Sequence, residues 1–63
     1  MYHTTVSNSR GIFADTLSEG LAEAILFCHE VGKKGDRVVV YEAVKDASGE
    51  VLHIAEVLST VLE

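Results

Sequence analysis

The amino-acid sequence predicts an α+β fold, a small antiparallel sheet of two to four strands with one amphipathic helix packed on one face, in the order β-α-β-β. Three observations lead to this prediction. Apolar residues recur with a helical period over residues 16–31, a valine-rich run covers residues 37–44, and turn-forming residues separate these segments from the rest. The 63-residue chain has no proline, internal repeat or linker-like stretch, so we expect one domain over residues 1–63.

The first strand is predicted at residues 2–7, which mix Tyr, Thr and Val. Residues 8–11 (Asn-Ser-Arg-Gly) then form a turn signal. After this turn, the sequence becomes apolar again at Ile12 and Phe13. Residues 11–14 therefore form either a short second strand or an extended lead into the helix.

The helix is predicted from Thr16 to Val31. The signals for its first turn, the period of its apolar residues and the signals for its end all indicate one helix over this range. Thr16 and Glu19 have the spacing of a capping box, in which each side chain bonds a backbone N–H of the first turn. Lys33 and Lys34 place positive charge at the other end. One apolar stripe faces the core, comprising Leu17, Leu21, Ala24, Cys28 and Val31. We therefore expect Cys28 to be buried.

We predict a central strand at residues 37–44, because three consecutive valines are followed by Tyr41 and Val44. Both faces of this strand are mostly apolar, so both should be covered. The helix covers one face, and a terminal segment or a second copy of the chain covers the other. A homodimer that pairs or packs through this strand is thus one possible function.

The last third of the sequence supports two interpretations. Residues 46–49 (Asp-Ala-Ser-Gly) fit a type I turn between antiparallel strands at residues 37–45 and 50–57. Apolar residues over 50–62 also recur at helical spacing, so a helical C-terminal segment is the alternative. We favour the hairpin as far as Val57, followed by a short helical or irregular tail.

Composition narrows the functional classes. The formal net charge of −5 disfavours direct binding to nucleic acid and favours a basic partner. The single cysteine fits a reducing compartment, so we expect a cytoplasmic protein. The longest apolar run, residues 24–28, is far too short to cross a membrane, so no membrane association is expected.

No residue pattern indicates catalysis, a cofactor or a metal. Cys28 and His29 are adjacent on the predicted helix and point to different faces. His3, His29 and His53 lie at no metal-ligand spacing. No glycine-rich phosphate loop is present. We therefore expect a protein that is not an enzyme.

The remaining candidate for function is the acidic face of the predicted helix. Glu19, Glu23 and Glu30 share this face, with Leu26 as an apolar residue among them. Together with Asp15, they are the predicted partner-binding residues, although a simply solvated face explains the same pattern. An apolar centre with charged residues around it is typical of small protein interfaces.

In its overall profile, a very short acidic chain with a compact α/β pattern and no catalytic motif, the sequence resembles the small phage-encoded anti-CRISPR inhibitors of bacterial defence. This resemblance rests on the profile and on no diagnostic motif. It implies a protein that blocks the basic nucleic-acid-binding surface of a CRISPR-Cas complex. The carboxylates named above would then take the place of phosphates.

Overall fold

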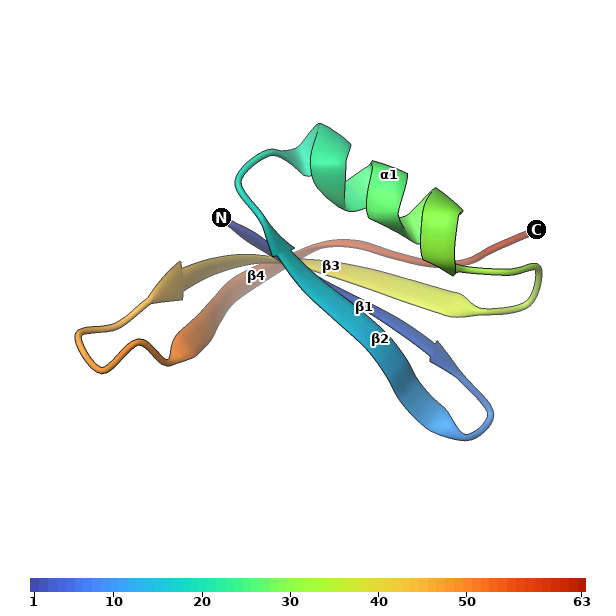
Figure 1. Ribbon diagram of the computed structural model, residues 1–63, viewed down its shortest axis with the longest axis horizontal. Coiled ribbons are helices and arrows are strands. Elements are labelled where there is room, and N and C mark those ends of the chain that lie inside the picture. The colour runs from blue at the N-terminus through green and yellow to red at the C-terminus, as the bar shows by residue number, and fades with distance from the viewer.

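The computed structural model describes residues 1–63 and contains a four-stranded antiparallel sheet with one helix. The sheet has the strand order β2-β1-β3-β4, and Figure 1 shows the helix lying across one face of it. The elements are, in chain order, β1 (Tyr2–Asn8), β2 (Gly11–Ser18), α1 (Leu21–Val31), β3 (Arg37–Lys45) and β4 (Val51–Val61). The α+β class is confirmed, but the observed order is β-β-α-β-β, so the predicted β-α-β-β order is wrong.

The difference in order arises at β2, where the predicted capping box does not form. Thr16 pairs with Thr4 of β1, and this pairing continues to Ser18, opposite Tyr2. The backbone groups of these residues are therefore used in the sheet. The helix begins only after this pairing ends, at Leu21, with Gly20 as its N-cap residue and no side-chain cap. The prediction of a helix from Thr16 was wrong by five residues.

The central position of β3 is confirmed, because β1 and β4 pair with its two edges. Strand β4 is also confirmed as the partner of β3, but it extends to Val61, opposite Arg37. The predicted helical or irregular tail after Val57, and the helical alternative for residues 50–62, are therefore wrong. Two register shifts along β3 and β4 interrupt strict alternation in this hairpin.

The turn between β3 and β4 forms at residues 46–49 as predicted. The Gly49 N–H donates to the Asp46 carbonyl at 3.0 Å, and the Asp46 carboxylate accepts from the Ser48 hydroxyl at 2.6 Å. This hydroxyl, followed by the backbone N–H of Glu50, lowers the pKa of Asp46. Gly49 has φ of +85°, a conformation that favours glycine.

The C-terminal end of the chain is held against the end of the helix. The Gly35 N–H donates to the Leu62 carbonyl at 2.8 Å, and the Leu62 N–H donates to the Asp36 carbonyl at 2.8 Å. A Cβ atom at Gly32 would collide with the Leu62 side chain and would lie 2.7 Å from the Cys28 carbonyl oxygen. Glycine at position 32 therefore allows Leu62 to pack on the core.

The core lies between α1 and the two central strands and is small. Only eight of the 63 residues are buried. Its main apolar cluster comprises Val6, Ala24, Cys28, Val38 and Val40. The predicted burial of Cys28 is confirmed, since the residue is 3% exposed, and burial raises the pKa of its thiol. By contrast, Leu17 lies on β2 and is exposed, so its predicted place in the helical stripe was wrong.

The sheet face opposite α1, here called the open face, is covered by no other element. Side chains alternate between the two faces along a strand. Because Thr4 and Val6 of β1 face the helix, His3 and Thr5 lie on the open face. The open face also carries Asp15 of β2 and Tyr41 of β3, which contact or pair with these residues. The expectation that both faces of β3 are covered is therefore not met within one chain.

The one helix is too short to span a membrane.

Replacing Thr4 with valine should stabilise the protein. Thr4 is 0% exposed and its hydroxyl has no hydrogen-bond partner, so a buried polar atom is left unsatisfied. Because valine has nearly the same shape, Thr4→Val should raise the free energy of unfolding by about 1 kcal/mol. Chemical denaturation measures this change. The control is Thr60→Val on β4, an exposed position where we expect a change within about 0.5 kcal/mol. Destabilisation by Thr4→Val would contradict the described packing.

The Cys28 thiol should resist alkylation in the folded protein. It is buried and its pKa is raised, so little thiolate is accessible at about pH 8. Iodoacetamide should modify the native chain more slowly than the denatured chain, by on the order of 100-fold or more, as followed by mass spectrometry. As a control, a cysteine at exposed position 9 (Ser9→Cys in a Cys28→Ala background) should react at the denatured rate. Equal rates for native and denatured Cys28 would mean that the helix is not packed on the sheet.

Candidate functional site

Three of the predicted partner-binding residues lie together in the structure. Glu23, Leu26 and Glu30 occupy successive turns of α1 and line one shallow groove between the helix and β2. We call this the helix groove, and its lining residues are Thr16, Leu17, Ser18, Glu23, Leu26, Phe27 and Glu30. The helix presents these positions on one side because residues three, four and seven apart share a face.

The helix groove has an apolar centre and an acidic rim. Leu26 is 57% exposed, although it is a large apolar residue in the middle of a helix. Phe27 beside it is half-buried and packs against the core, so the groove floor is fixed to the folded structure. Glu23 and Glu30 are exposed and form no ion pair, since the one such contact in the structure joins His3 and Asp15. This arrangement suits an extended or helical segment that carries both apolar and basic side chains.

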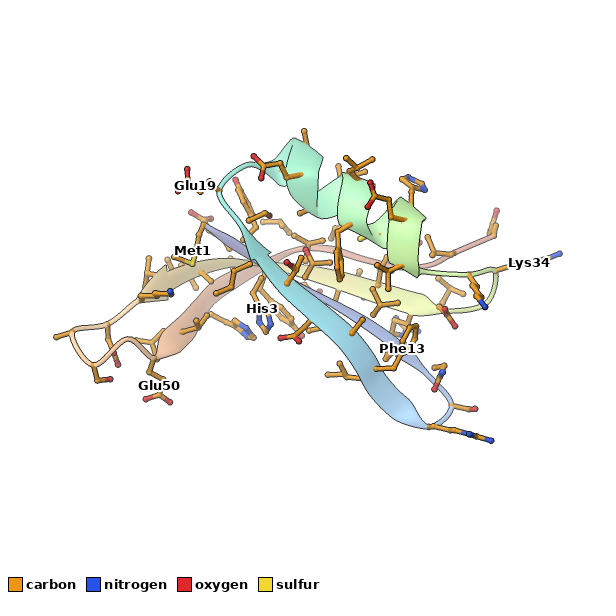
Figure 2. All side chains as sticks on the ribbon, in the orientation of Figure 1. Met1, His3, Phe13, Glu19, Lys34 and Glu50 are labelled. Carbon is orange, nitrogen blue, oxygen red and sulfur yellow. The ribbon has the colours of Figure 1, made fainter.

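Glu19 lies outside the helix groove. It belongs to the loop between β2 and α1, near Met1 (Figure 2). With Glu23, Met1 and Lys45, it lines a neighbouring depression. Because Lys45 contributes positive charge there, the end of the acidic surface near Glu19 is partly compensated. Glu23 lines this depression as well as the helix groove, whereas Glu30 lines the helix groove alone.

Asp15 is separated from the other predicted residues, because it lies on β2 and not at a helix N-terminus. Its side chain projects to the open face, where its Oδ2 lies 2.9 Å from Nε2 of His3. It therefore cannot share one contact surface with Leu26 in the helix groove. Its grouping with the helix depended on the predicted helix start at Thr16, which the structure overturns.

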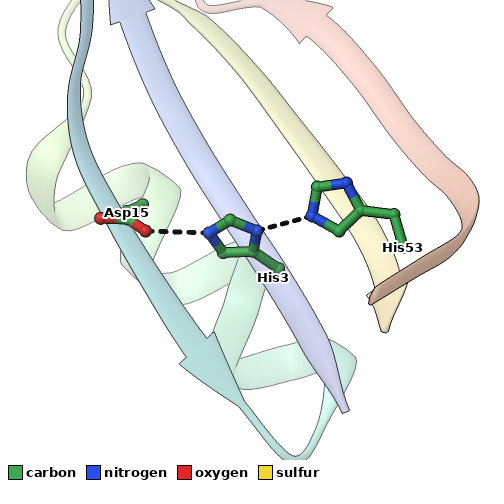
Figure 3. A network of polar contacts seen from close by, with 3 residues as sticks. All are labelled: His3, Asp15 and His53. Carbon is green, nitrogen blue, oxygen red and sulfur yellow. Dashed lines mark hydrogen bonds and ion pairs between the residues drawn. The ribbon is translucent and has the colours of Figure 1, made fainter. Parts of the chain in front are cut away.

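The open face carries a polar cluster that the sequence did not reveal. Nδ1 of His3 lies 2.8 Å from Nε2 of His53, and Asp15 contacts the opposite nitrogen of His3 (Figure 3). The His53 ring is stacked on Tyr41, with ring centroids 4.0 Å apart and planes 3° apart. The cluster thus takes one residue from each of the four strands: Asp15 from β2, His3 from β1, Tyr41 from β3 and His53 from β4.

The contacts in this cluster restrict where the protons lie. An ionised Asp15 accepts a hydrogen bond, so Nε2 of His3 carries a proton. In a neutral His3, Nδ1 is then an acceptor, and His53 donates to it from Nε2. The remaining nitrogen of His53 is then an acceptor. Asp15, His3 and His53 are therefore linked in that order by two hydrogen bonds.

This cluster is not predictable from local sequence, because its histidines are 50 positions apart. Their proximity depends on the strand order and on the β3–β4 register, which no local motif specifies. Alternation within the predicted strands would place each histidine on a face but would not bring the two together. No group of three or more histidine, cysteine or acidic side chains converges into a metal site.

Comparison of the chain with known protein families, curated proteins and solved structures finds no match in any of the three.

Proposed function

We propose that this protein is a small, non-enzymatic protein-binding module whose helix groove receives a segment of a basic partner. The observation that carries this proposal is the exposure of Leu26 between two acidic residues, Glu23 and Glu30, on one wall of that groove. A central apolar anchor contributes most of the binding energy in many interfaces, whereas charges at the rim set specificity and association rate.

The charge distribution supports a basic partner over a neutral one. The chain carries ten acidic and five basic residues, and no lysine or arginine forms an ion pair with any carboxylate. Lysine or arginine side chains of a partner would therefore meet unpaired carboxylates at Glu23 and Glu30. Such attraction also accelerates encounter, and this effect weakens as salt is added.

The partner that we propose is a nucleic-acid-binding protein or nucleoprotein complex, since these present basic surfaces. In this proposal, the module acts in the cytoplasm as an inhibitor that occupies such a surface, as the resemblance to anti-CRISPR proteins implies. The resemblance is one of overall profile, so it supports the class of partner and no individual contact. Glu23, Leu26 and Glu30 carry the proposed contact, while Asp15 lies on another face.

Self-association is a second candidate function, favoured by the exposed apolar residues of the edge strands. These include Ile12 and Phe13 on β2 and Leu52, Ile54, Val57 and Val61 on β4. Pairing through β3, as the sequence suggested, is not available because both of its edges are occupied. A dimer would instead extend the sheet at β2 or β4, or bury the open face.

Reversing charge on the groove rim should weaken binding of the partner. Affinity capture from a bacterial lysate with the wild-type chain and with Glu23→Lys/Glu30→Lys identifies proteins whose retention depends on the groove. For a protein so identified, the double reversal should raise Kd roughly 10-fold or more and reduce its dependence on salt. Titration calorimetry at several salt concentrations measures both effects.

The matched control is Glu50→Lys/Glu56→Lys, which changes net charge equally at exposed positions outside the groove. The control should retain the partner with an affinity close to that of the wild type. If both double variants weaken binding equally, net charge and not the groove determines affinity. If neither does, the proposed surface is wrong.

Light scattering across a dilution series separates the two candidate functions. A mass of one chain throughout would exclude the self-association function and leave the protein-binding proposal. A mass of two chains that persists on dilution would instead support the self-association function, and Ile54→Lys on β4 should then restore the single-chain mass.

A further inference from the structure

We propose that His3 and His53 form a two-histidine binding site for a divalent transition metal of the Zn²⁺ class on the open face of the sheet. In this proposal, Asp15 holds His3 in the required orientation and does not itself bind the metal. The site is separate from the helix groove, so the proposal does not depend on the function proposed above. It rests on the geometry of the cluster in Figure 3.

The contact between Asp15 and His3 has the form that supports histidine ligands in metal sites. Histidines that bind a metal commonly donate their other ring N–H to a carboxylate, which fixes the tautomer and the ring plane. Here Nε2 of His3 lies 2.9 Å from the Asp15 carboxylate. This leaves the lone pair of Nδ1 on the side that faces His53, so His3 already has the tautomer that metal binding requires.

The second ligand lies close to the position that a shared metal requires. Two nitrogens bound tetrahedrally at about 2.0–2.1 Å from Zn²⁺ are about 3.3–3.4 Å apart. Nδ1 of His3 and Nε2 of His53 are 2.8 Å apart. The ring centroids are 5.0 Å apart, close to the largest distance that this nitrogen separation allows, so the two rings point almost straight at each other. Binding one metal therefore requires the nitrogens to separate by about half an ångström and the rings to tilt until each lone pair lies about 35° from the line between the nitrogens. His53 is exposed, so its side chain can make this adjustment.

Stacking on Tyr41 restrains this adjustment to movement within the plane of the His53 ring. The His53 ring lies parallel to Tyr41, so it can slide over the phenol ring while the contact is retained. The ring is therefore held near His3 before any metal arrives. The two side chains lose part of their conformational entropy when the protein folds. Metal binding therefore has a smaller entropic cost than it has for two mobile histidines.

The protons of the cluster can rearrange for metal binding without any acid or base other than water. When His3 is neutral and donates to Asp15, His53 carries its proton on Nε2 in the hydrogen-bonded form. Metal binding at Nε2 transfers this proton, through solvent, to Nδ1 of the same ring, and His53 stays neutral. His3 keeps its proton on Nε2, bonded to Asp15. Two neutral imidazoles then bind the metal, and water completes its coordination.

Zinc titration of the purified full chain tests the proposal directly. We expect one Zn²⁺ per chain by calorimetry. In long-range ¹H–¹⁵N NMR spectra, the ring nitrogens of His3 and His53 should shift on zinc addition. His29, which is exposed on α1 and outside the cluster, should not shift. This measurement uses the wild-type chain, so it does not depend on whether any variant folds.

Variants then assign the roles. His53→Ala should abolish the zinc-induced shifts at His3, whereas His29→Ala, which removes the same side chain elsewhere, should bind as the wild type does. Asp15→Asn should weaken zinc binding about 10- to 100-fold, as loss of such a supporting carboxylate commonly does. Circular dichroism confirms that each variant is folded. The proposal is overturned if His53→Ala binds zinc as tightly as the wild type, or if zinc shifts His29 and leaves His3 unchanged.

Discussion

The antiparallel pairing of β1 with β3 is the interaction on which the rest of the structure depends. The chain forms two local hairpins, β1–β2 and β3–β4, whose turns point away from each other in Figure 1, and this is the one strand pairing that joins them. It places Val6 opposite Val38 and Thr4 opposite Val40, and thereby builds the floor on which α1 packs. On the other side of the same strands it places His3 opposite Tyr41, within reach of His53. The β1–β3 register therefore builds the core and, together with the β3–β4 register, the polar cluster.

A single helix of eleven residues cannot cover both faces of a four-stranded sheet. This constraint explains why few residues are buried and why large apolar side chains remain exposed at β2, at β4 and on the helix. Stability then depends on a small valine-rich core, and small domains of this kind have little margin. The same constraint leaves two surfaces available for function: the helix groove, with Leu26 at its centre, and the open face, with the histidines.

The parts of the fold that were predictable from sequence are those determined by neighbouring residues. The strand at residues 2–7, the central strand, the Asp46 turn and the burial of Cys28 all follow from local composition and period. Thr16 was assigned to the helix because its capping box is a valid local signal, yet pairing with Thr4 uses the same backbone in the sheet. Of the candidate site, Glu23, Leu26 and Glu30 were placed together by helical spacing alone. The position of Asp15 follows from the β1–β2 hairpin, whereas bringing His3 next to His53 requires the strand order, which is not a local property.

The most direct test of this account is a nuclear Overhauser experiment on the isolated protein. The strand order predicts backbone contacts between Thr5 and Val39, across β1 and β3, together with contacts between the ring protons of His3 and His53. Observing both sets would establish the pairing that creates the core and the cluster. The contradicting result is a helical pattern of sequential contacts over residues 51–61, with no contact between the two histidine rings.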